Sequence, residues 1–185
     1  MELPVTSRAA GKKTETKKIR REGNIPAILY SHGKEGEALT VDGRAFQKAL
    51  YRLPKGSLGT QIFTLKKDGK EIRALVKDVQ YKCTNYDLHH LDFEEIDEKV
   101  PVKVKVALRC TGEAECEGIK VGGFLRQVFR FVRVSCLPKD IPSCFELDVS
   151  ELGMGQSKKL SDIAIPAAVR PLIGLNEIAV VIAKR

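Results

Sequence analysis

Residues 61–81 read QIFTLKKDGKEIRALVKDVQY and contain the clearest strand signal of the N-terminal half. Two runs rich in Ile, Leu and Val, 61–67 and 71–81, flank the tetrapeptide Lys67-Asp68-Gly69-Lys70. An Asp-Gly pair between two such runs favours a β-hairpin, because the tight turn needs residues that tolerate positive φ. The stretch therefore predicts two antiparallel strands in a mainly β domain.

Further strands are expected on both sides of this hairpin. IPAILY at 25–30 is one, and LHHLDFEEI at 88–96 is another, with Leu91 and Phe93 on one face and His90 and Asp92 on the other. Alternation of valine with lysine or arginine predicts a strand over 100–109, VPVKVKVALR. The remaining strands are expected at 126–136, 144–150 and 176–184.

Two short helices are expected before the hairpin. One covers 14–22 and ends at Gly23; the other covers 43–53, with Asp42 as its N-cap. The charged run EEIDEK at 94–99 separates the two strand patterns. We therefore expect two domains, 1–97 and 98–185, both mainly β.

Composition limits the class of protein. The chain has a formal charge of +8, a pI near 9.3 and 43% hydrophobic residues, which favours a globular protein with an acidic partner. No run approaches the ~18 apolar residues of a membrane span, so we expect a cytoplasmic protein with no membrane partner. The five cysteines lack the spacing of a zinc site or a disulfide framework, and no cofactor is expected.

A basic segment precedes the first strand pattern. Only Glu15 opposes the seven cations between residues 8 and 21, which are Arg8, Lys12, Lys13, Lys17, Lys18, Arg20 and Arg21. Solvated helices usually interleave opposite charges, whereas phosphates would relieve this repulsion. Zinc-finger spacing, a basic zipper and a helix-turn-helix pattern are all missing, which favours a structured RNA over DNA.

Catalysis has little support in the sequence. His90 and Asp92 share one face of a strand, but no nucleophile motif or metal set accompanies them. We expect the pair to lie at the surface, with Asp92 orienting the histidine through a hydrogen bond. Gly122-Gly123 lacks the surroundings of a nucleotide-binding loop and is interpreted as a turn. We expect a protein that is not an enzyme.

Three motifs resemble the 5S rRNA-binding domain of the family of bacterial large-subunit ribosomal protein twenty-five. They are Arg8 followed by RREGNIPAILY at 20–30, ALVKDVQ at 74–80, and LHHLDF at 88–93. GIKVGGFL at 118–125 and CLPKDIPSCFELDVSEL at 136–152 resemble the C-terminal domain of its longer form, the general stress protein CTC family. The resemblance implies a six-stranded β-barrel like the anticodon-binding barrels of glutaminyl-tRNA synthetase, followed by a β-rich domain.

The same resemblance implies binding to 5S rRNA in the central protuberance of the large subunit, beside neighbouring ribosomal proteins. The implied RNA contacts are Arg8, Lys13, Lys17, Lys18, Arg20, Tyr30, Lys77, Gln80, His90 and Asp92, and Arg21 of the basic segment is added to them. Gln80-Tyr81-Lys82-Cys83 departs from the family's Q-x-H-P sequence, and lysines occupy 17 and 18 where arginines are common. An alternative is a tRNA-binding module that acts with a synthetase-like partner.

Overall fold

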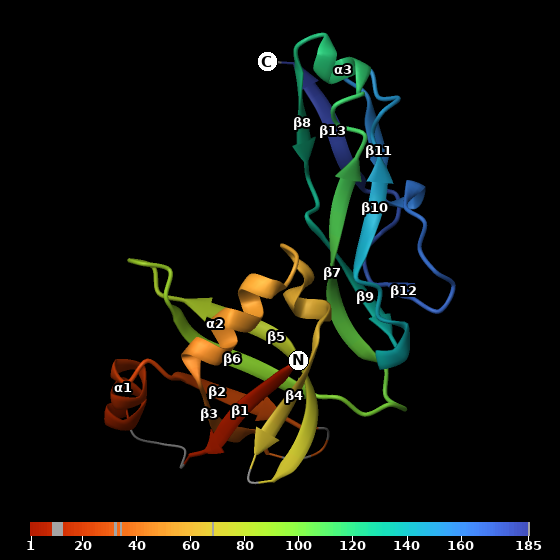
Figure 1. Ribbon diagram of the computed structural model, residues 1–185. Helices are drawn as coiled ribbons and strands as arrows, with labels where there is room; N and C mark the ends of the chain where they lie inside the picture. The colour runs from red at the N-terminus through yellow and green to blue at the C-terminus, as the bar shows by residue number, and fades with distance from the viewer. Residues whose placement is uncertain (9–12, 32, 34, 68, 185) are drawn as a thin grey trace. The chain divides into compact units, whose positions relative to one another are not determined.

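The computed structural model describes residues 1–8, 13–31, 33, 35–67 and 69–184 (Figure 1). Lys12 of the basic segment and Asp68 of the predicted turn lie outside these residues, and only the backbone of Lys13 is described. The chain divides into two compact units, Met1–Asp97 and Glu98–Arg185. Strands dominate both units and the helices are short, which confirms the mainly β class.

The first unit is a closed barrel with the strand order β1-β3-β2-β6-β5-β4. β1 is parallel to β4 and β2 is parallel to β6, while the other neighbours are antiparallel. The predicted six-stranded barrel is therefore confirmed. Its elements are β1 (Glu2–Ser7), α1 (Lys13–Arg21), β2 (Ile25–Tyr30), β3 (Glu37–Val41), α2 (Gly43–Arg52), the 3-10 helix η1 (Ser57–Thr60), β4 (Ile62–Lys67), β5 (Lys70–Tyr81) and β6 (Leu88–Glu95).

The barrel interior is filled by side chains that alternate along the strands. Phe63 of β4 and Phe93 of β6 are fully buried and meet edge to face, with ring centroids 6.5 Å apart. Phe46 of α2 joins them, 6.0 Å from Phe63. Removing one such ring would cost about 3–5 kcal/mol of folding free energy, so these contacts fix α2 on the barrel.

The predicted hairpin is confirmed. β4 and β5 pair in register from Ile62 opposite Leu75 to Lys67 opposite Lys70. Gly69 adopts a φ of +80°, a conformation that a residue without a Cβ reaches at no steric cost.

The end of the first predicted helix and the start of the second lie where expected. Gly23 has a φ of +82°. The N–H of Gly23 donates to the carbonyl of Arg20, and the N–H of Asn24 donates to the carbonyl of Ile19. These two hydrogen bonds form a Schellman motif. At the start of α2, Oδ1 of Asp42 accepts hydrogen bonds from the N–H groups of Arg44 and Ala45, at 2.9 and 3.4 Å. The Asp42 cap is therefore confirmed.

The second unit contains two sheets, with the strand orders β10-β7-β9-β12 and β11-β13-β8. Along β7, Val102, Val104 and Val106 are buried and the lysines between them are exposed, as the alternation predicts. The elements are β7 (Val102–Thr111), α3 (Glu117–Lys120), β8 (Gly123–Gln127), β9 (Phe131–Cys136), η2 (Pro138–Asp140), β10 (Cys144–Asp148), β11 (Ser157–Lys159), η3 (Leu160–Asp162), β12 (Arg170–Pro171) and β13 (Ile178–Lys184).

Two expectations need correction. The single strand predicted over 126–136 is wrong, because β8 ends at Gln127 and β9 begins at Phe131. The two strands belong to different sheets, and the N–H groups of Val128 and Phe129 both donate to the carbonyl of Ala179 where the chain changes sheet. Four strands, β1, β3, β11 and β12, and the short helix α3 were also not predicted.

Candidate nucleic-acid interface

Helix α1 presents most of the predicted cations to solvent. The side chains of Lys17, Lys18 and Arg21 are exposed, and that of Lys18 lies 3.9 Å from the carboxylate of Glu22. An exposed pair of this kind contributes little to stability. These side chains are therefore available to an anion at small energetic cost.

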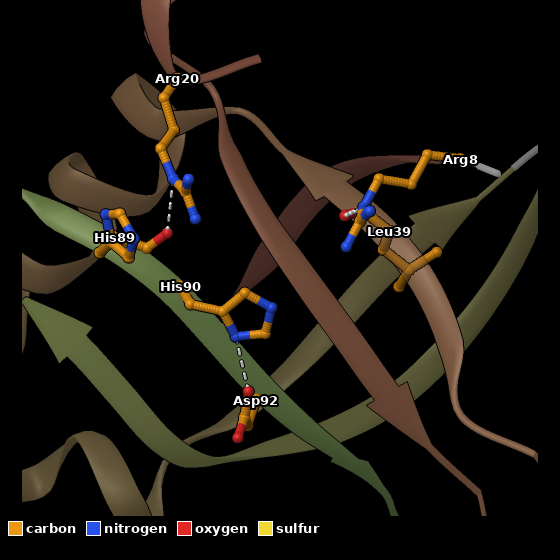
Figure 2. Close-up of polar contacts among 6 residues, drawn as sticks. All are labelled: Arg8, Arg20, Leu39, His89, His90 and Asp92. Atoms are coloured by element: carbon orange, nitrogen blue, oxygen red, sulfur yellow. Dashed lines mark hydrogen bonds and ion pairs between the residues drawn. The ribbon is translucent and has the colours of Figure 1, made fainter. Parts of the chain in front are cut away.

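Arg8 and Arg20 are held more firmly than the other cations. Nε of Arg20 donates to the carbonyl of His89 at 3.1 Å, and Nε of Arg8 donates to the carbonyl of Leu39, also at 3.1 Å (Figure 2). Burial, and second the charge of Arg8, lower the pKa of the Arg20 guanidinium. A phosphate bound to both guanidinium groups would offset the unfavourable effect of the Arg8 charge on Arg20.

His90 and Asp92 form the hydrogen bond expected of them on the outer face of β6. Nδ1 of His90 lies 2.7 Å from Oδ1 of Asp92 (Figure 2). The intervening Leu91 and the following Phe93 are fully buried, as the alternation predicts. The pair is more buried than expected of a surface pair, because only 15% of the His90 side chain and 24% of the Asp92 side chain are exposed.

Strand register brings further predicted residues beside this pair. Gln80 of β5 lies directly opposite His90, and its side chain is exposed. Tyr30, at the end of β2, is 46% exposed and pairs with Glu94, two residues beyond Asp92. The barrel therefore gathers Gln80, His90, Asp92 and Tyr30 on its outer surface.

Lys77 is a predicted contact that is already engaged within the protein. Its Nζ lies 2.6 Å from Oε2 of Glu94, and about one third of each side chain is exposed. That carboxylate oxygen is itself inaccessible to solvent. An RNA contact by Lys77 would have to share this ammonium with Glu94, and that contact stays a prediction.

A groove beside α1 contains cations that sequence reasoning missed. It has a volume of about 690 Å³, and Arg44, Gln47, Lys82 and His89 line it together with Lys17, Arg20 and Arg21. The acidic groups in its lining are Glu22 and Asp87. A Cβ on Gly43 would collide with the carbonyl of Gly23, so this glycine allows α2 to begin directly beside the end of α1.

The electrostatics of the groove are visible at His89. Burial, followed by the charges of Arg20, His90 and Lys82, lowers the pKa of this imidazole below 6.5. Arg44 and Lys82 are far from the basic segment in sequence, and only folding brings them to it. No local pattern predicts such a cluster.

No helix within the described ranges is long and apolar enough to cross a membrane. Among the same residues, no group of three or more His, Cys, Asp or Glu side chains is placed to hold a metal ion.

Comparison with known proteins gives matches along the whole chain. Residues 3–93 match the Ribosomal L25p family, and residues 101–185 match the C-terminal domain of ribosomal protein TL5. The large ribosomal subunit protein bL25 of Chlamydia trachomatis serovar L2 is 51% identical over 185 residues, which is 100% of both chains. The proteins of the same name from Chlamydia pneumoniae and Chlamydia abortus are 50% and 51% identical, with the same coverage.

The class defined by the barrel, its cationic helix and these matches is that of ribosomal proteins. The chain belongs to the bL25 family. Members of this family are structural constituents of a ribonucleoprotein rather than enzymes, so His90 and Asp92 need no catalytic role. Ribosomes are cytoplasmic in bacteria, which agrees with the location expected from the sequence.

Proposed function

We propose that the chain binds 5S rRNA through its first unit and so helps to build the central protuberance of the large subunit. The observation that supports this most is the contact between Arg20 of α1 and the carbonyl of His89. It joins the cationic helix to the strand that bears the His90–Asp92 pair. Phosphate-binding and base-reading groups would therefore lie side by side on one unit.

The cations would contact the RNA backbone. Lys17, Lys18 and Arg21 are long, exposed side chains that suit phosphates along a groove. Arg8 and Arg20 each use Nε on a backbone carbonyl, which orients the rest of the planar guanidinium. An oriented fork gives up less conformational entropy when it binds a phosphate than a free side chain does.

The His90–Asp92 pair would supply selectivity. Since a carboxylate only accepts hydrogen bonds, Nδ1 of His90 carries the proton of this bond, and Nε2 is an acceptor whenever the ring carries no second proton. That nitrogen suits a ribose 2′-hydroxyl or a base N–H in the wide minor groove of RNA. The amide of Gln80, opposite His90, adds a donor and an acceptor at the same place.

We also propose that the two units are independent domains, 1–97 and 98–185. Each unit has its own buried core, and the acidic run at 94–97 precedes the boundary. The first would contain the 5S rRNA site, and the second would contact neighbouring ribosomal components.

Crosslinking in the native cells tests the proposed function. RNA crosslinked to the full-length protein would be sequenced, and we expect 5S rRNA to dominate. Charge reversal by Lys17→Glu with Arg21→Glu should abolish the enrichment, whereas Lys70→Glu with Lys99→Glu, two exposed lysines outside the interface, should preserve it. Recovery of tRNA together with a synthetase would instead support the alternative and contradict the proposal.

A further inference from the structure

The second unit has a cationic sheet face of its own. Its centre is a cross-strand pair, Lys105 of β7 directly opposite Arg133 of β9, and both side chains are exposed. Arg170 of β12 extends the row of positive charge, because it pairs with Ser135 of β9 on the other side of that strand. Cations from three neighbouring strands thus lie along one sheet.

The central pair is not neutralised within the protein. Like charges directly opposite each other destabilise a sheet. Throughout the parts of the chain that the structure describes, neither Lys105 nor Arg133 forms an ion pair with a carboxylate. An external anion at this point would therefore be bound with a gain in stability.

A shallow hollow of about 480 Å³ lies against this pair. Besides Lys105 and Arg133 it is lined by Arg130 and by apolar residues, with no carboxylate in the lining: Val128, Phe129, Phe131, Leu172 and Ile173. Val128, Phe131 and Leu172 are 52%, 43% and 47% exposed. Phe131 stands two residues from Arg133 on β9 and therefore projects from the same face as Arg133.

We propose that this face, Lys105, Arg130, Phe131, Arg133 and Arg170, binds an unpaired segment of RNA. The guanidinium and ammonium groups contact consecutive phosphates, and a base stacks on the exposed ring of Phe131. A cationic groove with an aromatic platform is the arrangement that binds single-stranded nucleic acid without sequence preference. The site is separate from the one on the first unit, so the chain would hold RNA at two places.

The test uses the full-length protein with saturating 5S rRNA and a short, fluorescein-labelled single-stranded RNA as the probe. Binding of the probe is measured over a series of KCl concentrations. Lys105→Ala with Arg133→Ala should reduce the salt slope by about 1.4, because each of the two phosphate contacts contributes roughly 0.7 to it. Phe131→Leu should weaken binding about tenfold and leave the slope unchanged, because stacking releases no counterions.

A matched control removes the same charge elsewhere in the second unit. Lys120→Ala with Lys184→Ala changes two exposed lysines on α3 and β13 and should leave the slope unaltered. Thermal melts should show that all variants remain folded. An equal fall in slope for both double variants would show that net charge alone acts and would overturn the proposal. Tighter binding of a polyglutamate of matched charge would overturn it in favour of an acidic protein partner.

A second readout locates the contact and does not depend on the site of the first unit. The protein with p-benzoylphenylalanine in place of Phe131 is incorporated into large ribosomal subunits and irradiated. We expect a crosslink to rRNA from this position and none from the same photoreactive residue in place of Val121, which is 74% exposed. A crosslink to protein, or none, at position 131 would contradict an RNA partner even if 5S rRNA binding by the first unit is intact.

Discussion

Helix α1 and strand β6, which the hydrogen bond from Arg20 to the carbonyl of His89 joins, hold their polar groups in opposite ways. On α1, Lys17, Lys18 and Arg21 extend into solvent. On β6, His90 and Asp92 are largely covered and hydrogen-bonded to each other, on a strand that the barrel core and two neighbouring strands fix in place. Helix α1 therefore offers exposed positive charges, whereas β6 holds hydrogen-bonding groups at fixed positions.

This difference matches the two requirements of RNA recognition. Phosphate contacts supply affinity that does not depend on sequence, and flexible cations suit them because the phosphates of any RNA are alike. Discrimination requires donors and acceptors held at fixed positions, since a hydrogen bond weakens steeply when its geometry is poor. Arg20 belongs to both regions, because its charge comes from the helix and its Nε contact reaches the strand.

The largest effect is expected when both regions are removed together. The fragment 98–185 should bind 5S rRNA more than about a hundredfold more weakly than the full chain, because several charge-assisted hydrogen bonds are removed at once. The fragment 1–97 should fold alone and retain the affinity. Limited proteolysis followed by gel shifts of both fragments measures this. Full affinity for 5S rRNA in the fragment 98–185 would show that neither α1 nor β6 is needed for binding.

Arg20→Ala should have the next largest effect. It removes a cation and the contact between α1 and β6, so binding of 5S rRNA should become less favourable by about 2–3 kcal/mol. Arg20→Lys keeps the charge without the fork and should recover only part of this affinity. Calorimetric titration of both variants decides; equal affinity of Arg20→Lys and the unmodified protein would show that the Nε contact is unimportant.

Asp92→Asn should cost about 1–2 kcal/mol of 5S rRNA binding, because the side chain keeps its shape but no longer fixes the protonated nitrogen of His90. The two side chains are partly buried, so we expect a fall in folding free energy of about 1 kcal/mol as well. Binding calorimetry and thermal melts of Asp92→Asn and His90→Ala separate the two effects. Normal binding with a large loss of stability would mean that the pair is purely structural.

The smallest effect concerns the groove between the helix and the strand. The pKa of His89 is lowered below 6.5, first by burial and then by Arg20, His90 and Lys82, so the unfolded chain takes up the proton first as the pH falls. The contribution of His89 to stability is therefore unchanged above about pH 7 and turns unfavourable on acidification through about pH 6.5. Melting temperatures over this range, compared with those of His89→Gln, measure the effect; identical pH dependence would contradict it.

The sequence predicted those parts of the fold that have a local cause. The Asp-Gly turn, the Gly23 helix end, the Asp42 cap and the alternation along β6 and β7 each depend on residues a few positions apart. Strands β1 and β3 were missed because neither has a turn signal as clear as the Asp-Gly pair between β4 and β5. The break in 126–136 was missed because its cause is a change of sheet, which hydrophobicity does not record.

The candidate site divides in the same way. The basic helix and the pairing of His90 with Asp92 follow from spacing alone, and the hydrogen bond is present. The partial burial of that pair, the engagement of Lys77 by Glu94, and the arrival of Arg44 and Lys82 beside α1 all depend on tertiary contacts. The spacing of residues in the sequence predicts which side chains share a face of a helix or strand. Contacts between elements distant in the sequence are known only from the fold.

The most direct test compares salt dependence with selectivity in two sets of variants. Affinities for 5S rRNA and for a tRNA competitor would be measured over a series of KCl concentrations. We predict that Lys17→Ala with Arg21→Ala lowers the slope for both RNAs by about 1.4–1.8, since each phosphate contact contributes roughly 0.7–0.9, and leaves their affinity ratio unchanged. Asp92→Asn should reduce the preference for 5S rRNA over tRNA and leave the slope unchanged. If the helix variant changes the ratio, or if the strand variant changes only the slope, the division of labour between α1 and β6 is contradicted.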